Sequence, residues 1–295
     1  MGEELIIENK SDSIYLMKLK YKSGNTPLIK IKKLCKRFSL DNLFIKDESK
    51  NPFGTFKDRR SEFIIKRGIE EHIDKFVIIT SGNAGYSLAK FAEGTNIKIV
   101  NFFDRKKIKK SIKNKLKKVS YKAIEIDLSK KIWTPEEIIA TARENDTEVI
   151  WDATDGIYDY QNGYIKIIEE VKDEKPDFII VPVGSGEAFY GLYEGIKKFK
   201  LKTKLIGVGV KNKWRSFADK LYTPWTPYES KMKAIQKDGH KTIRLDEDEV
   251  KQMWKEFKNV IDCEPSAAVV FSVFSKIKFT KQDKIILINS GKGLF

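Results

Sequence analysis

The sequence predicts an α/β protein of two lobes, each an open, twisted, mostly parallel sheet with helices on both faces. Strand-like apolar runs alternate with amphipathic helix-length stretches from about residue 42 onward, which is typical of parallel sheets covered by helices. The chain of 295 residues is long for one hydrophobic core and short for three. Its hydrophobic share of 41% supports a packed protein, so we expect two lobes.

No internal repeat or Gly/Ser linker separates the halves of the chain, so we expect the two lobes to pack against each other. We place residues 51–157 in a smaller lobe, and residues 1–50 with 158–295 in a larger lobe. In this architecture ligands bind in a crevice beyond the carboxyl ends of the strands, which predicts a site between the lobes.

Individual strands are predicted from short apolar runs bounded by polar residues. They cover residues 43–45, 76–80, 97–103, 123–126, 149–151, 178–183, 204–210 and 285–288. Amphipathic stretches between these strands predict helices over residues 87–93, 135–144, 163–172 and 246–259.

The formal net charge of +15 has its densest contribution in residues 104–118. Ile108, Ile112 and Leu116 recur there every four residues, which predicts one amphipathic helix with a narrow buried stripe. No aromatic platform or nucleic-acid-binding signature accompanies the run. We therefore interpret it as a solvated helix face and expect no nucleic-acid partner. Attraction of anionic substrates is a second interpretation.

Targeting and redox features favour the reducing cytoplasm. The sequence has neither the long uncharged apolar run of a membrane helix nor the layout of a secretory signal at its start, so no membrane association is expected. Cys35 and Cys263 lie far apart without a CxxC partner, which argues against a disulfide framework and a cysteine metal site. We expect the only histidines, His72 and His240, to be solvated, so no metal cluster or serine-hydrolase triad is predicted.

One lysine, Lys57, stands where covalent chemistry is favoured. It follows the strand-like run 42–48 and a Pro/Gly turn, within Asn51-Pro-Phe-Gly-Thr-Phe-Lys57-Asp-Arg59, at the start of a helical pattern. An amine that is held partly away from solvent on such a turn can be neutral and form a Schiff base with a carbonyl. Any single lysine of so lysine-rich a chain is more simply a surface charge, but two loops downstream change this interpretation.

The second loop, Thr80-Ser-Gly-Asn-Ala-Gly85, follows a predicted strand and opens a helix. Small residues let backbone N–H groups approach a ligand, and the helix N-terminus favours an anion such as an α-carboxylate. Ser81 and Asn83 add side-chain donors. An ordinary strand-to-helix turn explains the loop equally well when it is taken alone.

The third loop, Val183-Gly-Ser-Gly-Glu-Ala-Phe-Tyr-Gly191, lies between a strand and another helix, so its N–H groups can hold a phosphate. It lacks the lysine of a P-loop and the spacing of the dinucleotide GxGxxG pattern. Ser290 follows the last predicted strand, where its hydroxyl could meet a ring atom of a ligand. A buried lysine, an anion loop and a phosphate loop together imply an aldehyde cofactor that carries its own phosphate.

This combination resembles the fold-type-II pyridoxal-phosphate enzymes, the tryptophan synthase β-like superfamily, and is most similar to threonine synthases. The resemblance runs from about residue 24 to the end, with the motifs in the family's order. They are Gly24-Asn-Thr-Pro-Leu28, Lys46-Asp-Glu-Ser49 with Asn51–Arg59, Ser81-Gly-Asn-Ala-Gly85, Gly184-Ser-Gly186, Glu264-Pro-Ser-Ala-Ala268 and Ser290-Gly-Lys-Gly-Leu294.

The resemblance implies roles for these residues and pyridoxal 5′-phosphate as cofactor. Lys57 is expected to bind the cofactor covalently and to move the substrate α-proton. Asn83 is expected to contact the cofactor's 3′-oxygen, and Ser290 the pyridine nitrogen. The substrate carboxylate is assigned to the loop Thr80, Ser81, Gly82, Asn83 and Ala84. The cofactor phosphate is assigned to the backbone of Gly184, Ser185, Gly186, Glu187 and Ala188.

The implied activity is a lyase of amino-acid biosynthesis that converts O-phosphohomoserine to threonine, and the implied assembly is a homodimer. Four residues depart from the threonine synthase pattern. Phe53 replaces a small or hydroxylated residue, Arg60 and Glu187 each replace a small residue, and Lys292 replaces histidine. The Glu187 carboxylate must turn away from a phosphate or meet a cation. β-Replacement on O-acetylserine or O-phosphoserine therefore stays an alternative, followed by serine or threonine deamination and by a degenerate binding protein.

Overall fold

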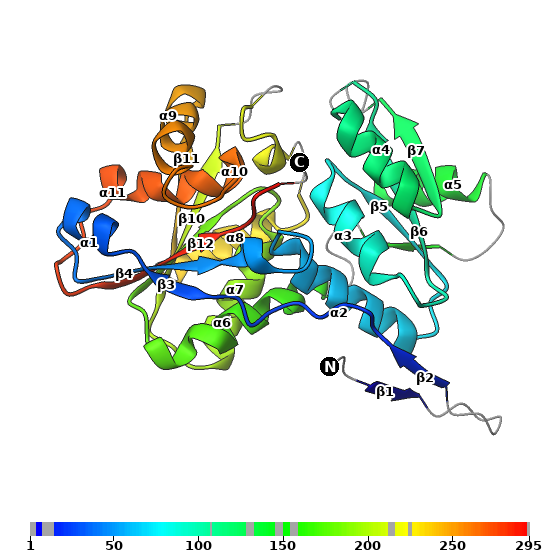
Figure 1. The fold of residues 1–295 in the computed structure, drawn as a ribbon, viewed down its shortest axis with the longest axis horizontal. Helices are drawn as coiled ribbons and strands as arrows, with labels where there is room; N and C mark the ends of the chain where they lie inside the picture. Colours follow the sequence, from blue (N-terminus) through cyan, green and yellow to red (C-terminus); the bar gives the residue numbers. More distant parts are fainter. Residues whose placement is uncertain are drawn as a thin grey trace. The chain divides into compact units, whose positions relative to one another are not determined.

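The computed structural model of the chain describes residues 4–7, 15–106, 108–127, 133–144, 150–153, 159–211, 216–223 and 226–293. The chain divides into two compact units, shown with their elements in Figure 1. Unit one comprises residues 1–23, 57–155 and 294–295, and unit two comprises residues 24–56 and 156–293. The unit boundary thus falls between Phe56 and Lys57 and places the first 23 residues with unit one. The predicted lobes, divided at residues 51 and 157, stay a prediction about domains.

Unit two is built on a six-stranded sheet with the order β11-β10-β9-β12-β4-β3. Its strands are β3 (Leu28–Lys30), β4 (Asn42–Asp47), β9 (Phe178–Pro182), β10 (Lys204–Val210), β11 (Lys241–Leu245) and β12 (Lys284–Asn289). All neighbours pair in parallel except β3, which runs antiparallel to β4 at one edge. The predicted strands of this half of the chain are therefore confirmed, and two edge strands are added.

Alternating side chains of this sheet enter two different cores, because successive residues of a strand point to opposite faces. On one face Ile180, Ile285 and Leu287 pack with helices α1, α9 and α11, whereas Ile179 and Ile286 pack on the other face with α6, α7 and α8. The helices of unit two are α1 (Lys32–Phe38), α6 (Ile165–Val171), α7 (Glu187–Lys198), α8 (Glu229–Lys237), α9 (Glu247–Phe257), α10 (Pro265–Ala268) and α11 (Val273–Lys276). Both faces are covered, as the continuous apolar strands require.

Unit one has a smaller parallel sheet with the order β7-β6-β5-β8. Its strands are β5 (Lys75–Ile79), β6 (Lys98–Asp104), β7 (Lys122–Ile126) and β8 (Trp151–Asp152), and its helices are α2 (Lys57–Glu70), α3 (Asn83–Phe91), α4 (Lys110–Val119) and α5 (Pro135–Arg143). Helix α5 packs on Val77 and Val100, while α4 packs on Phe103. Two further strands, β1 (Glu4–Ile7) and β2 (Tyr15–Lys18), form an antiparallel pair. The α/β fold class is confirmed.

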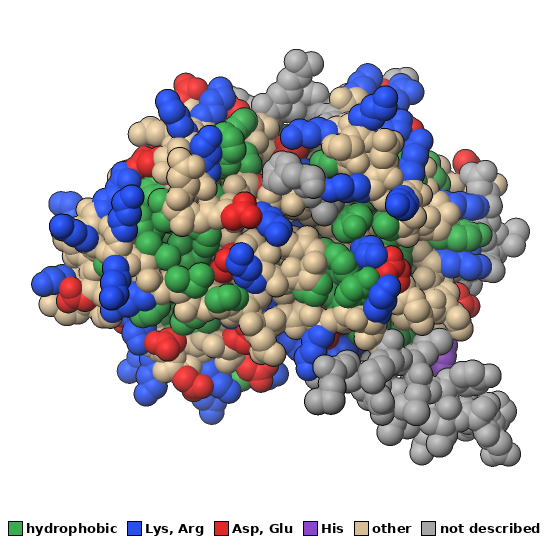
Figure 2. All heavy atoms as spheres, in the orientation of Figure 1, with side chains coloured by type: hydrophobic (Ala, Val, Ile, Leu, Met, Phe, Trp, Pro, Cys, Tyr) green, Lys and Arg blue, Asp and Glu red, His purple; other side chains and the backbone are tan. Residues whose placement is uncertain are grey.

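The basic run forms a shorter helix than the one predicted over 104–118: Asp104 ends β6, α4 begins at Lys110, and Ile112 and Leu116 are buried beneath it while Ile108 precedes the helix. Lys113 and Lys117 both pair with Glu125 of β7, at 2.5 and 3.1 Å. On the face drawn in Figure 2, Lys and Arg side chains are scattered, with acidic side chains between them. This distribution supports the interpretation of α4 as a solvated helix.

Two other predicted helices also differ clearly in their bounds from those observed. The helix predicted over 87–93 begins at Asn83, because the loop residues Asn83 to Tyr86 already form its first turn. The helix predicted over 163–172 divides into a 3-10 turn, Tyr160–Tyr164, and α6. Val149 and Leu294 lie outside the described residues. Within the described part of the chain, no helix is long and apolar enough to cross a membrane.

Candidate active site

Three motifs that are distant in sequence meet at one edge of the unit-two sheet. Strands β9, β12 and β4 are parallel neighbours, so their carboxyl ends lie at the same edge. Beyond these ends follow the Gly184–Gly186 loop, Ser290 and the segment from Glu48 to Phe56. The topology therefore brings the Gly184–Gly186 loop, Ser290 and the segment that precedes Lys57 to one edge of the sheet.

The loop Gly184–Gly186 has the properties of an anion cradle. Gly186, with φ of +95°, immediately precedes α7, a helix of 12 residues. In the described part of the chain, no group accepts a hydrogen bond from the backbone N–H of Gly184, Ser185 or Gly186. A Cβ on Gly186 would stand 2.6 Å from Sδ of Met232, so the methionine would have to move, and the positive φ independently favours glycine. Unpaired N–H donors at a helix N-terminus fit a phosphate group.

The neighbours of this loop hold its shape. The Ser185 hydroxyl accepts from the backbone N–H of Glu187 at 3.5 Å, and the Thr226 hydroxyl donates to the Ser185 carbonyl. Glu187 and Ala188 are the first two residues of α7, and both are buried. The Glu187 side chain is only 2% exposed, so its carboxylate is held inside the fold instead of in solvent.

The lysine loop is bound to the end of β12 through its backbone. The N–H of Phe56 donates to the carbonyl of Ser290 at 2.9 Å, and Thr55 forms an antiparallel bridge with Gly291. A Cβ on Gly291 would stand 2.8 Å from the Gly54 carbonyl oxygen, so glycine permits this close approach. Ser290 is therefore fixed relative to Phe56, the residue that directly precedes Lys57.

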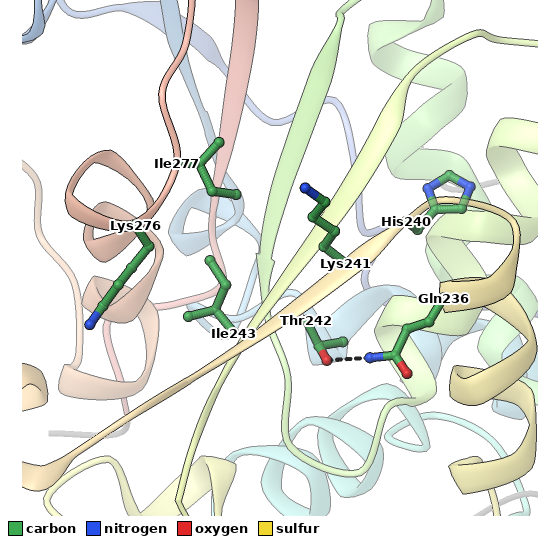
Figure 3. Close-up of a pocket in the computed structure, with 7 residues that line it drawn as sticks. All are labelled: Gln236, His240, Lys241, Thr242, Ile243, Lys276 and Ile277. Atoms are coloured by element: carbon green, nitrogen blue, oxygen red, sulfur yellow. Dashed lines mark hydrogen bonds between the residues drawn. The ribbon is translucent and has the colours of Figure 1, made fainter.

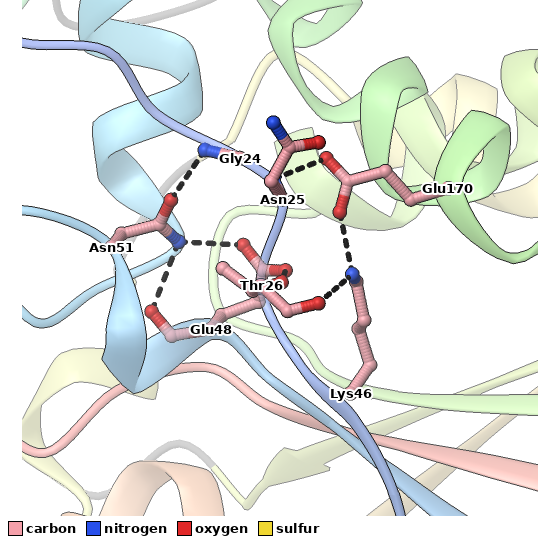
Figure 4. Close-up of polar contacts among 7 residues, drawn as sticks. All are labelled: Gly24, Asn25, Thr26, Lys46, Glu48, Asn51 and Glu170. Atoms are coloured by element: carbon pink, nitrogen blue, oxygen red, sulfur yellow. Dashed lines mark hydrogen bonds and ion pairs between the residues drawn. The ribbon is translucent and has the colours of Figure 1, made fainter.

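A buried carboxylate, Glu48, ties the same loop to the first motif, as Figure 4 shows. Its two oxygens accept from the Thr26 hydroxyl and the Asn51 amide, both at 2.7 Å. The Asn51 oxygen accepts in turn from the N–H of Gly24 at 2.9 Å. Glu48 is fully buried, so its two acceptor oxygens depend on these donors. The network fixes the start of the lysine loop against residues 24–26.

An ion pair supports this network from α6. Lys46 contacts Glu170 and the Thr26 carbonyl, both at 2.5 Å, and the second Glu170 oxygen accepts from the N–H of Asn25 at 2.9 Å. Lys46 is 2% exposed, and a buried ammonium requires such partners. No motif signalled Glu170, because a single acidic residue in an amphipathic helix has no distinctive sequence pattern.

A second buried carboxylate lies under Ser290. Asp47 and Asn289 are paired across β4 and β12. The Asp47 carboxylate accepts from the Asn289 amide at 2.8 Å and from the Ser49 hydroxyl at 2.6 Å. The Asn289 amide also donates to the Asp262 carbonyl at 3.1 Å. These bonds fix the strand end that carries Ser290, and the sequence motifs did not signal them.

In unit one, two of the predicted residues are the first residues of neighbouring helices. Lys57 begins α2 and Asn83 begins α3. One turn after Asn83, the Ser87 hydroxyl donates to the fully buried Asp58 carboxylate at 2.6 Å and lies 2.8 Å from the Ser61 hydroxyl. These contacts bring the start of α3 close to the start of α2, so Lys57 and Asn83 occupy one region of the unit.

The predicted substrate loop is organised by the hydroxyl of Thr80. This oxygen accepts from the N–H groups of Gly82 and Gly85, at 2.9 and 3.0 Å, which shapes the turn. Ser81 is exposed, Gly82 is buried with φ of +135°, and Ala84 is half-buried. The side chain of Thr80 thus serves the turn itself, while that of Ser81 faces solvent.

His240 corrects the expectation of a solvated histidine. Its exposed fraction is 8%, and its Nδ1 accepts from the backbone N–H of Leu205 at 2.9 Å. Burial, together with the positive charge of Lys204, lowers the pKa of the imidazole below 6.5. His72, by contrast, is exposed.

His240 lines a cavity of about 360 Å³ at the amino end of β11, shown in Figure 3. The other lining residues are Gln236, Lys241, Thr242, Ile243, Lys276 and Ile277. The candidate site lies at the opposite, carboxyl edge of this parallel sheet, so the cavity does not belong to it. Among the described residues, no group of three or more His, Cys, Asp or Glu side chains could hold a metal ion.

Comparisons with known proteins define the class. The family model described as pyridoxal-phosphate dependent enzyme matches residues 19–291, so the chain belongs to this family. Its cofactor is pyridoxal 5′-phosphate, which confirms the cofactor predicted from the loops. The Gly184–Gly186 donors and the lysine that begins α2 fit the phosphate and the aldehyde of that cofactor.

Individual relatives are more distant. Threonine synthase of Methanosarcina acetivorans is 24% identical over 186 residues, which are 60% of this chain and 44% of that protein; the alignment thus spans less than half of the relative's length. The structure of O-acetylserine dependent cystathionine beta-synthase from Helicobacter pylori has a TM-score of 0.75 at 17% identity and covers 91% of this chain and 92% of the other. The structure of serine racemase from Dictyostelium discoideum has a TM-score of 0.74 at 21% identity and covers 92% of this chain and 93% of the other. These structures confirm the fold-type-II architecture.

Proposed function

We propose that the chain is a lyase of the threonine synthase type, which removes phosphate from O-phosphohomoserine and adds water to give threonine. The observation that carries this proposal is the loop Asn51–Arg59, whose pattern resembles the cofactor-lysine signature of threonine synthases. The similarity to the archaeal threonine synthase supports the same substrate class. The net charge of +15 suits a substrate that carries a phosphate. We further propose that the enzyme is a cytoplasmic homodimer.

Bound pyridoxal phosphate supplies an electron sink for negative charge on the substrate carbon beside the amino group. Lys57 Nζ takes the proton from this carbon and returns it, so the lysine must be neutral when it accepts. Within the loop of residues 80–84, the N–H groups of Thr80 and Gly82 already donate inside the fold, so the remaining N–H groups and the Ser81 hydroxyl bind the substrate carboxylate. Asn83 would hold the bound cofactor through its ring oxygen, and the Ser290 hydroxyl would contact its ring nitrogen.

The backbone of residues 184–188 holds the cofactor phosphate. Three observations support this assignment: the N–H groups of the glycine loop have no acceptor among the described residues, the loop opens a helix, and the positive φ of Gly186 favours glycine there. The positive end of the α7 dipole adds favourable electrostatics for a dianion. The buried contacts of Glu48 and Asp47 keep the lysine loop and Ser290 in register during turnover.

The experiment is an assay of the purified, cofactor-loaded protein with O-phosphohomoserine, in which phosphate and threonine are both measured. We expect equal amounts of the two products, and no product from the Lys57→Ala variant. Turnover of another amino acid without turnover of O-phosphohomoserine would remove the threonine synthase assignment and leave the cofactor assignment intact.

A β-replacement enzyme that uses O-acetylserine or O-phosphoserine is the second candidate. The departures at Phe53, Glu187 and Lys292 favour it, because they lie in the motifs by which threonine synthases are recognised. Addition of O-acetylserine followed by sulfide distinguishes the two candidates. Cysteine formation at a rate above that of threonine formation from O-phosphohomoserine would establish this alternative, and ammonia release from serine or threonine would indicate a deaminase.

A further inference from the structure

Lys292 occupies an unusual place in the site described above. It is the second residue after Ser290, and its backbone N–H donates to the carbonyl of Gly54 in the lysine loop at 3.1 Å. The preceding peptide is fixed too, since the carbonyl of Gly291 accepts from the N–H of Glu264 at 3.0 Å. The backbone that carries Lys292 is thus bound on both sides to segments of unit two.

The aliphatic part of the Lys292 side chain packs on the lysine loop. A Cβ built on Gly54 would stand 3.0 Å from Cε and 3.2 Å from Cγ of Lys292, so the stem lies directly against Gly54 and a larger residue there would push it away. Gly54 also has φ of +75°, which independently favours glycine. The lysine loop therefore holds the Lys292 side chain along its surface at Gly54, which lies three residues before Lys57.

The ammonium of Lys292 has no hydrogen-bond or ion-pair partner among the described residues, and the residue is exposed. The two buried carboxylates of the Lys46–Ser49 motif are engaged by other groups: Asp47 by Ser49 and Asn289, and Glu48 by Thr26 and Asn51. Packing orders the stem while the charge stays available. A free cation at the edge of a catalytic loop attracts an anion, and lysine binds phosphate as a point charge.

We propose that Lys292 is a specificity-determining residue that binds the anionic substituent of the substrate, a phosphate or another multivalent oxyanion on the side chain of the amino acid. This inference rests on the proposed function, because it names a contact for the phosphate of an O-phosphorylated substrate. A neutral O-acetyl substrate would gain nothing from this contact.

The first experiment compares cofactor-loaded wild type with Lys292→Gln, Lys292→Arg and the control Lys237→Gln, which removes the same charge from an exposed end of α8. We expect Lys292→Gln to raise KM for the O-phosphorylated substrate about 10- to 100-fold with little change in kcat, because a charge-assisted contact is lost. Kinetics with the O-acetyl substrate should change less than twofold. Arginine should restore most of the affinity. Equal effects on both substrates, or equal effects of Lys237→Gln, would overturn the proposal.

The second experiment does not depend on turnover. Lysine acylation of the cofactor-loaded protein is followed by mass spectrometry, with and without inorganic phosphate. We expect phosphate to slow the modification of Lys292 several-fold and to leave Lys237 unchanged. If phosphate protects Lys292 while O-phosphohomoserine is not turned over, the anion subsite stands and the proposed reaction fails. If Lys292 is not protected, the subsite fails whatever the enzyme converts.

Discussion

Replacing Gly186 with alanine tests whether the Gly184–Gly186 loop holds the cofactor phosphate. At φ of +95° a residue with a side chain costs on the order of 1 kcal/mol. The new Cβ would also stand 2.6 Å from Sδ of Met232, and overpacking of this kind costs about 1 to 3 kcal/mol. Methionine is flexible, so we expect the lower part of that range and a total cost of about 2 kcal/mol.

Gly94→Ala is the matched control. Gly94 has φ of +85°, similar to Gly186, but an added Cβ there meets nothing within 4 Å. Only the backbone strain of about 1 kcal/mol should remain. For a chain of this size, each kcal/mol lowers the melting temperature by about 2 to 4 °C. The cofactor-free Gly186→Ala protein should therefore melt several degrees below Gly94→Ala.

The two variants should differ more in cofactor affinity than in stability. Moving the loop displaces its N–H donors, so Gly186→Ala should bind pyridoxal phosphate at least tenfold more weakly, which corresponds to about 1.4 kcal/mol. Gly94→Ala should bind as wild type does. Absorbance titration of the cofactor-free proteins measures both dissociation constants. Wild-type affinity in Gly186→Ala would refute the assignment of the loop, and equal melting temperatures of the two variants would refute the steric argument.

Three further predictions follow from buried groups. The fold should become less stable as the pH falls below about 6.5, because the pKa of His240 is lowered in the folded state and protonation of its Nδ1 breaks the hydrogen bond from the Leu205 N–H. A pH series of melting temperatures should therefore show a smaller decrease at low pH for His240→Asn than for wild type. The same decrease in both proteins would contradict this. Burial raises the pKa of the Cys263 thiol to about 12. Iodoacetamide at pH 8 should therefore leave this thiol unmodified until urea unfolds the chain. Rapid labelling of Cys263 in the folded protein would contradict the prediction. Ser87→Ala should lower the free energy of unfolding by about 1 to 3 kcal/mol, because it removes a hydrogen-bond donor from the buried Asp58 carboxylate. The control Ser275→Ala, at an exposed serine, should lower it by less than half as much. Similar melting temperatures of the two variants would argue against a stabilising role of the Ser87–Asp58 contact.

Much of the fold could be predicted because its central strands are continuous apolar runs. β12 and β9 are buried on both faces, and such strands stand out in sequence. β11 was missed because its residues, Lys-Thr-Ile-Arg-Leu, are mostly polar, as suits an edge strand. β3 has only three residues, and its antiparallel pairing with β4 depends on a partner that local sequence does not reveal.

The site was predictable where a backbone conformation demands a particular residue. Gly186 at positive φ and the glycine-rich loop after β9 are visible as composition and spacing. The supporting carboxylates were not visible in this way. Glu170 and Asp58 act through partners 145 and 29 residues away in sequence, and isolated acidic residues in helices are common. His240 was misjudged because its acceptor role depends on the neighbouring strand β10, not on its own turn.

The covalent role of Lys57 can be measured most directly by chemical trapping. The cofactor-loaded protein is reduced with borohydride, digested, and examined by mass spectrometry for the lysine that carries the reduced cofactor. We predict modification of Lys57 alone among the lysines of the chain, and no modification in Lys57→Ala. An unmodified Lys57 in cofactor-saturated protein, or stable labelling of a different lysine, would contradict the central claim.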